Sequence, residues 1–266
     1  MTMTCGPFAV LTRPAGRNDA LAARLRAQGW DVLDLPALEI EALPADAATL
    51  PRPGDHDLVV FVSGTAVRCY LRQLRDVAGM QQWPAGVTAA CVGPATAAAL
   101  RDSSFWHDGA QLLHPGPGAP AYDSEALWQL MQARGFMPRR VLLVRGTTGR
   151  DWLGQTLASQ GADVRAHAAY RRVPAQWPAT ALPILMSCRD EGRPAHWLLT
   201  SGEGIQAVHG QIRRAGLESW WRRCRFVVTH PRLVQHLEAF APDAVARGMV
   251  KICLPEDEAI EQALRA

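Results

Sequence analysis

The sequence contains an internal repeat, and this repeat constrains the fold more than any other feature. A short apolar run ends on Arg13, and a second apolar run ends on Arg145, 132 positions later. A helix-like stretch follows each run and stops at glycine, at Gly29 in the first copy and at Gly161 in the second. An Asp-Val pair follows each of these glycines at the same offset. A repeated strand and helix unit predicts two related halves.

Two further blocks recur in the same order. Residues 58–64 are a short apolar run ending in Ser-Gly, and they match residues 196–202 at an offset of 138. Residues 90–94 match residues 227–231 at an offset of 137. The small drift of the offset suits a loop insertion around residues 179–194. Short buried strands that alternate with helices predict an α/β fold with mostly parallel sheets.

The loops after the predicted strands form the candidate binding region. In parallel sheets, ligands bind beyond the carboxyl ends of the strands, so we expect the chemistry in a cleft where the two halves face each other. Ser63 and Ser201 open helices, where they either cap the helix or, with the unpaired backbone amides, hold an anion. Arg13 and Arg145 end equivalent strands on this side, and arginine suits carboxylates or phosphates.

Bulk properties exclude several classes of function. A length of 266 residues suits two domains, and a formal net charge of +3 is too small to indicate a nucleic-acid partner. The six cysteines form no CxxC pair and no metal-like cluster. The sequence shows no leader peptide and no apolar stretch of the roughly 18 residues that cross a membrane. We therefore expect a cytoplasmic protein with no membrane contact and no metal.

Cofactor and nucleophile motifs are also missing from the sequence. No GxGxxG follows a strand, and there is no GxxxxGK[ST], GxSxG or HExxH. The sequence therefore predicts no cofactor and no serine nucleophile.

Taken together, the ordered blocks resemble the uroporphyrinogen-III synthase family. The stretches that carry the resemblance are residues 11–14, 35–40, 61–67, 92–96, 123–127, 141–146, 169–174 and 199–202. They span nearly the whole chain in the family's order. The resemblance implies two similar flavodoxin-like α/β domains with parallel sheets, interleaved and joined by two strand linkers.

The resemblance also implies where the domains divide. Residues 1–37 and 174–266 would form the first domain, which is discontinuous, and residues 43–168 the second. Residues 38–42 and 169–173 would be the linker strands, and such a pair would act as a hinge.

The implied activity is the cyclisation of hydroxymethylbilane, a linear tetrapyrrole fringed with acetate and propionate groups. Its hydroxyl leaves to give an azafulvene, a spiro intermediate forms, and the last pyrrole ring is inverted before closure. The implied enzyme is a lyase without a cofactor, and we expect a monomer that at most meets the upstream deaminase transiently. A non-enzymatic two-lobed binding or regulatory protein for an anionic small molecule remains the alternative.

Tyr170 matches the tyrosine that the family places in its second linker strand, facing the cleft. A phenol keeps its proton at neutral pH and can donate it to the departing hydroxyl. The alternative is a tyrosine that only packs. Hydroxyl positions of the family and the strand-end loops together give the predicted substrate-binding set, which is Arg13, Ser63, Gly64, Thr96, Arg145, Gly146, Ser201, Gly202 and Thr229. His230 replaces the glycine found at the equivalent position of the first half.

Overall fold

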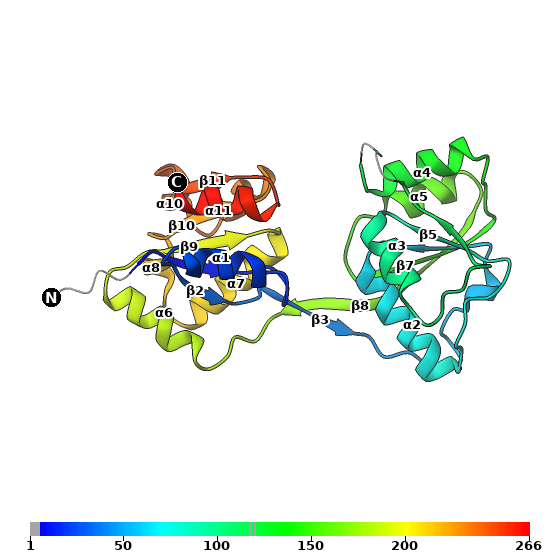
Figure 1. Cartoon of the computed structure of the whole chain (residues 1–266), viewed down its shortest axis with the longest axis horizontal. Helices are drawn as coiled ribbons and strands as arrows, with labels where there is room; N and C mark the ends of the chain where they lie inside the picture. Colours follow the sequence, from blue (N-terminus) through cyan, green and yellow to red (C-terminus); the bar gives the residue numbers. More distant parts are fainter. Residues whose placement is uncertain (1–5, 117–118, 120) are drawn as a thin grey trace. The chain divides into compact units, whose positions relative to one another are not determined.

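The protein, a computed structural model describing residues 6–116, 119 and 121–266, divides into two compact units (Figure 1). Unit 1 combines Met1–Glu39 with Val173–Ala266, and unit 2 is Ile40–Arg172. Each unit contains one sheet whose strands alternate with helices. The predicted α/β class with parallel sheets is confirmed.

The sheet of unit 1 has the strand order β11-β10-β9-β1-β2, and all of its pairings are parallel. Its strands are β1 (Phe8–Leu11), β2 (Asp31–Asp34), β9 (Ala195–Leu199), β10 (Arg225–Val228) and β11 (Val250–Ile252). Its helices are α1 (Asp19–Ala27), α6 (Ala181–Asp190), α7 (Gly202–Arg214), α8 (Glu218–Trp221), α9 (Arg232–Glu238), α10 (Pro242–Ala246) and α11 (Asp257–Arg265).

The second sheet has the strand order β3-β8-β7-β4-β5-β6. Its strands are β3 (Leu38–Ala42), β4 (Leu58–Phe61), β5 (Thr88–Cys91), β6 (Gln111–Leu113), β7 (Arg140–Gly146) and β8 (Asp163–Pro174). The helices of unit 2 are the 3-10 turn η1 (Pro53–Asp55), α2 (Gly64–Ala78), α3 (Pro94–Arg101), α4 (Ser124–Ala133) and α5 (Trp152–Ser159).

The repeat in the sequence is also a repeat in space. The order β10-β9-β1-β2 in unit 1 corresponds to β5-β4-β7-β8 in unit 2, strand by strand. Even the register is kept, since Phe8 pairs with Asp31 and Arg140 pairs with Asp163, each 132 positions further along. The two units therefore build the same parallel core with a permuted connection.

Each sheet is buried on both faces because its strands are apolar at successive positions. In β1, Phe8 and Val10 join one core cluster while Ala9 and Leu11 join the cluster on the opposite face. The same alternation divides the residues of β4 between the two clusters of unit 2. Helices therefore cover both faces of each sheet, and each unit has a core of its own.

One local prediction needs correction. The expected loop insertion at residues 179–194 contains α6, which buries Ala181, Leu185 and Cys188 in the core of unit 1. Residues 169–173 form the final part of the longer strand β8, whose first part pairs with β7, and their role as a linker strand stays a prediction. A helix with three buried positions and a strand continued by ladder bonds both depend on tertiary contacts that local sequence does not display.

We predict that residues 40–172 fold without the rest of the chain, because both core clusters of this unit lie within that range. Circular dichroism should show one cooperative thermal transition with native-like secondary structure. The matched fragment is unit 1 closed by a short Gly/Ser linker from Glu39 to Val173. The Ala175 amide donates to the Ala37 carbonyl at 3.0 Å, which holds those two ends close. Non-cooperative melting of residues 40–172 would contradict the division into two units.

Candidate functional site

The carboxyl edge of the unit 2 sheet collects several of the predicted site residues. β4, β5 and β7 are parallel neighbours, so their ends at Phe61, Cys91 and Gly146 lie along one edge. Ser63 and Gly64 follow the first of these strands directly. The topology therefore brings together loops that are more than 80 positions apart in the sequence.

Tyr170 reaches this edge because β8 contains an irregularity. Arg145 pairs with Ala168 and Gly146 pairs with Tyr170, so Ala169 is an extra residue opposite β7. A bulge of this kind bends the strand and redirects the side chain that follows it. Tyr170 is 3% exposed, and its hydroxyl lies 3.2 Å from the Ser63 Oγ. The phenol is therefore packed, but its oxygen belongs to a polar pair at the strand ends.

Ser63 combines two roles. It is the N-cap of α2, where its Oγ accepts the Ala66 amide at 3.1 Å. A hydroxyl has one proton and two lone pairs, so Ser63 can also donate its own proton to the Tyr170 oxygen. That arrangement leaves the phenolic proton available to a ligand. The sequence left two roles open for Ser63, as a helix cap or as a binding residue, and the geometry allows both at once.

Gly146 makes room for the tyrosine ring. A Cβ at this position would lie 3.0 Å from Cε2 and Cζ of Tyr170, which is tighter than nearly all real Cβ contacts. The next residue fixes the same strand end, since the Thr147 amide donates to the Tyr170 carbonyl at 3.0 Å. The predicted binding residue Gly146 thus has a steric role toward Tyr170 within unit 2.

Gln73 is a residue of this site that the sequence analysis missed. Its buried amide on α2 donates to the carbonyls of Leu43, at 2.8 Å, and of the bulge residue Ala169, at 3.4 Å. Its Oε1 lies 2.8 Å from Nε2 of His167, so that nitrogen carries the proton. Burial, helped by the charge of Arg165, lowers the pKa of His167, which favours the neutral ring. In the sequence, Gln73 could have been identified as a polar residue on the otherwise apolar face of a predicted helix.

The β5–α3 loop completes the edge in unit 2. Thr96 lies in the first turn of α3 and is almost fully buried, and its role in binding stays a prediction. A Cβ on Gly64 would lie 3.3 Å from Nη1 of Arg68 and 3.4 Å from the Cβ of Ala99 on α3. A Cβ on Gly93 would lie 3.0 Å from the Cβ of Tyr122, whose half-exposed ring the sequence analysis did not single out.

The carboxyl edge of the unit 1 sheet repeats this loop chemistry. Ser201 is the N-cap of α7, and its Oγ accepts the Gly204 amide at 3.0 Å. Gly202 lies against His236, since a Cβ there would come within 3.2 Å of the imidazole. Thr229 is partly exposed at the end of β10. Nδ1 of His230 accepts the Arg232 amide at 3.1 Å, so the bulkier residue closes the turn into α9.

The two repeated arginines have equivalent internal partners. Arg13 donates from Nε to Asn18 Oδ1 at 3.0 Å and from Nη1 to Asp257 Oδ1 at 2.7 Å. Arg145 donates from Nη1 to Asp151 Oδ1 at 2.8 Å. Asn18 and Asp151 both immediately precede the following helix, so each arginine closes its own strand-to-helix loop. Their role in substrate binding remains a prediction.

The described part of the chain offers no group of three or more His, Cys, Asp or Glu side chains arranged to hold a metal ion. Nor does any described helix have the length and apolarity needed to cross a membrane.

We predict that Gly146→Ala destabilises the protein by about 1–3 kcal/mol, because the added methyl meets the Tyr170 ring. In a Tyr170→Ala background the same change should cost at least about 1 kcal/mol less, as measured by a double-mutant cycle in urea. Gly54→Ala is the matched control, since its Cβ would meet nothing within 4 Å. If Gly146→Ala lowered the stability equally in the two backgrounds, the proposed steric contact would be wrong.

Comparisons with known proteins show to which family the sequence is similar. The family model described as uroporphyrinogen-III synthase HemD matches residues 19–247. The uroporphyrinogen-III synthase of Salmonella typhimurium is 31% identical over 227 residues, covering 84% of this chain and 87% of that protein. The Escherichia coli enzyme of the same name is 29% identical over 229 residues, covering 85% and 88%.

Two solved structures share the fold. The uroporphyrinogen-III synthetase of Helicobacter pylori aligns with a TM-score of 0.57 at 15% identity, covering 97% of each chain. A mutant uroporphyrinogen III synthase from Thermus thermophilus aligns with a TM-score of 0.53 at 17% identity, covering 98% of this chain and 96% of that chain. These low identities support the fold alone, while the family match covers most of the sequence. The chain belongs to the uroporphyrinogen-III synthase HemD family.

Proposed function

We propose that this chain is a uroporphyrinogen-III synthase, which closes hydroxymethylbilane into a macrocycle with inversion of the last pyrrole ring and loss of water. The match of the family model to residues 19–247 carries this conclusion. By reaction the enzyme would be a lyase. The same match favours an enzyme over a non-enzymatic binding or regulatory protein.

The strand-end loops supply the chemistry that such a substrate needs for binding. Its acetate and propionate groups are anions, and the N-termini of α2, α3 and α7 carry backbone amides without intrahelical acceptors. Ser63 and Ser201 add hydroxyl groups to two of these helix starts. We propose that the loops of both units bind the carboxylate fringe, which a repeated loop set is suited to do.

The reaction begins when the terminal carbon–oxygen bond breaks. The hydroxyl gains a proton as it leaves as water, and the electron pair of the pyrrole nitrogen forms the new double bond. The pyrrole N–H then loses its proton, so the azafulvene is neutral and one water is removed in all. We propose that the Tyr170 hydroxyl donates a hydrogen bond to this oxygen. Ser63, 3.2 Å from the phenol, would donate to the phenolic oxygen and so direct its proton outward.

The remaining steps depend on geometry more than on protein functional groups. The azafulvene is already electrophilic, and the last pyrrole ring is the nucleophile, so no cofactor is required. The protein must hold the chain in the conformation that leads through the spiro intermediate and exclude direct head-to-tail closure. The packed tyrosine and its bulge, fixed by Gln73 and Gly146, give this site little freedom to shift.

We further propose that the protein acts in the cytoplasm as a monomer, with transient contact to the deaminase that supplies its unstable substrate. The absence of a membrane-spanning helix among the described residues is compatible with this location.

We predict that Tyr170→Phe slows the formation of uroporphyrinogen III by about tenfold or more, because the hydrogen bond to the departing hydroxyl is lost. The assay supplies fresh hydroxymethylbilane and separates the porphyrin isomers after oxidation. Isomer I should rise, since unconverted substrate closes without inversion.

Tyr70→Phe is the matched control for this experiment. Tyr70 is another buried tyrosine of unit 2, and its hydroxyl donates to the Pro51 carbonyl at 2.8 Å, away from the strand ends. Its loss should lower stability by about 1 kcal/mol without changing the isomer ratio. An unchanged rate for Tyr170→Phe would exclude the acid role, and isomer I alone from the wild-type protein would exclude the synthase activity.

We predict that Ser63→Ala lowers both stability and turnover. Loss of the α2 cap should cost about 0.5–2 kcal/mol, and loss of the partner of Tyr170 should slow the reaction several-fold. Asp123→Ala is the matched control because Asp123 caps α4 through the Ala126 amide at 2.9 Å and does not touch Tyr170. Thermal melts and initial rates separate the effects. Similar rates for the two variants would assign Ser63 to capping alone.

A further inference from the structure

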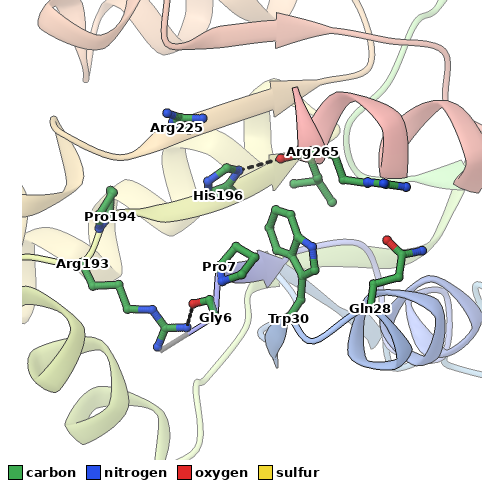
Figure 2. Close-up of a pocket in the computed structure, with 10 residues that line it drawn as sticks. Gly6, Pro7, Gln28, Trp30, Arg193, Pro194, His196, Arg225 and Arg265 are labelled. Atoms are coloured by element: carbon green, nitrogen blue, oxygen red, sulfur yellow. Dashed lines mark hydrogen bonds between the residues drawn. The ribbon is translucent and has the colours of Figure 1, made fainter. Parts of the chain in front are cut away.

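A pocket of about 630 Å³ lies at the amino edge of the unit 1 sheet (Figure 2). Pro7 precedes β1, Trp30 precedes β2, Pro194 precedes β9, and Arg225 opens β10. The amino ends of parallel strands share one edge, which is opposite to the edge that carries the strand-end loops. The volume is within the range of roughly 300–1,000 Å³ typical of small-molecule sites.

Three guanidinium groups line this pocket, and they differ in how far they are engaged. Arg193 donates to the Gly6 carbonyl and to Oδ2 of Asp31, which lies 2.6 Å away. These contacts hold its guanidinium in place at the side of the pocket. Arg265 is 59% exposed and only loosely paired, with Glu261 at 3.8 Å. The exposed guanidinium of Arg225 has no hydrogen-bond or ion-pair partner among residues 6–116, 119 and 121–266.

The field of the surrounding helices does not by itself favour an anion here. α1 and α11 both end at this edge, and helix C-termini carry partial negative charge. If the arginines had only a structural role, it would be to neutralise the partial negative charge of these helix ends. That interpretation accounts for Arg265, which lies in the last turn of α11. Arg225 opens β10 and turns an exposed guanidinium to the same pocket.

His196 determines whether a ligand in this pocket must donate or accept a hydrogen bond. Its Nδ1 lies 2.8 Å from the Leu264 carbonyl, which can only accept, so Nδ1 carries the proton. Burial lowers the pKa of His196, and the charge of Arg225 acts in the same direction, although the Leu264 contact opposes it. The neutral ring then has a lone pair on Nε2. A ligand that meets it must supply an N–H or O–H group.

Trp30 supplies a flat apolar boundary beside that histidine. Its ring stands edge-on to His196, with centroids 5.0 Å apart and an interplanar angle of 88°. Figure 2 shows Trp30 between His196 and Gln28, with Arg225 beyond the histidine. An aromatic ring is the shape that such a boundary accommodates best.

We propose that this pocket is a second ligand site, for a planar aromatic anion that carries both a carboxylate and a ring N–H group. The carboxylate binds Arg225, with Arg265 as the second cation within reach of the pocket. The ring N–H donates to Nε2 of His196, and the ring packs beside Trp30. Because this edge is remote from the strand-end loops of unit 1, the ligand does not compete with substrate there.

Isothermal titration of the full chain with three matched probes tests the assignment. Indole-3-acetate has the ring, the N–H and the carboxylate, indole-3-ethanol lacks the charge, and benzofuran-3-acetate replaces the N–H by oxygen. Indole-3-acetate should bind at one site, and each of the other probes should bind about tenfold or more weakly, since one loses the charged contact with Arg225 and the other loses the hydrogen bond to His196. No binding of indole-3-acetate, or equal binding of the three, overturns the proposal.

Variants locate the binding. Arg225→Gln should weaken indole-3-acetate about tenfold or more, whereas Arg223→Gln, an exposed arginine that does not line the pocket, should leave it unchanged. Equal affinities of the two variants overturn the assignment. In the synthase assay, saturating probe should leave KM for hydroxymethylbilane unchanged, and a KM that rises with probe concentration would place the probe at the strand-end loops instead. The titrations test the second site independently of whether the chain has synthase activity.

Discussion

Tyr170 can meet Ser63 only because β8 carries one more residue than the stretch of β7 that it pairs with. Without the extra Ala169, the alternation of side chains along the strand would turn the phenol to the opposite face of the sheet. Gln73 binds the carbonyl of that extra residue, and the missing side chain of Gly146 leaves space for the ring. The arrangement at the strand ends of unit 2 therefore depends on one irregularity in strand pairing.

The duplication explains why similar loop chemistry recurs at the other sheet. In each unit a serine caps the helix after the central strand, and an arginine at the end of the neighbouring strand holds the residue before the next helix. The copies also differ, since His230 closes its turn with a side chain where Gly93 stands in the other unit. Equivalent scaffolds thus carry loops that are free to diverge in what they bind.

Much of this architecture could be predicted from the sequence because it depends on local signals. Apolar runs ending at Arg13 and Arg145 located two strands, and serines before helical stretches located two caps. The partners of the arginines could not be predicted, since Asp257 lies 244 positions from Arg13. The helix α6 was missed because its three buried positions become visible only against the sheet. Likewise, Thr96 matched a hydroxyl position of the family, but its burial is set by the packing of α3.

In the proposed mode of binding, strand-end loops of both units hold the carboxylate fringe of the substrate. Hydrogen exchange with mass spectrometry, in the presence and absence of uroporphyrinogen III without oxygen, measures this directly at backbone amides. Exchange should slow in residues 63–67 and 93–97 of unit 2 and in residues 201–205 and 229–233 of unit 1. Protection confined to one unit, or unchanged exchange at all four segments, would contradict the account.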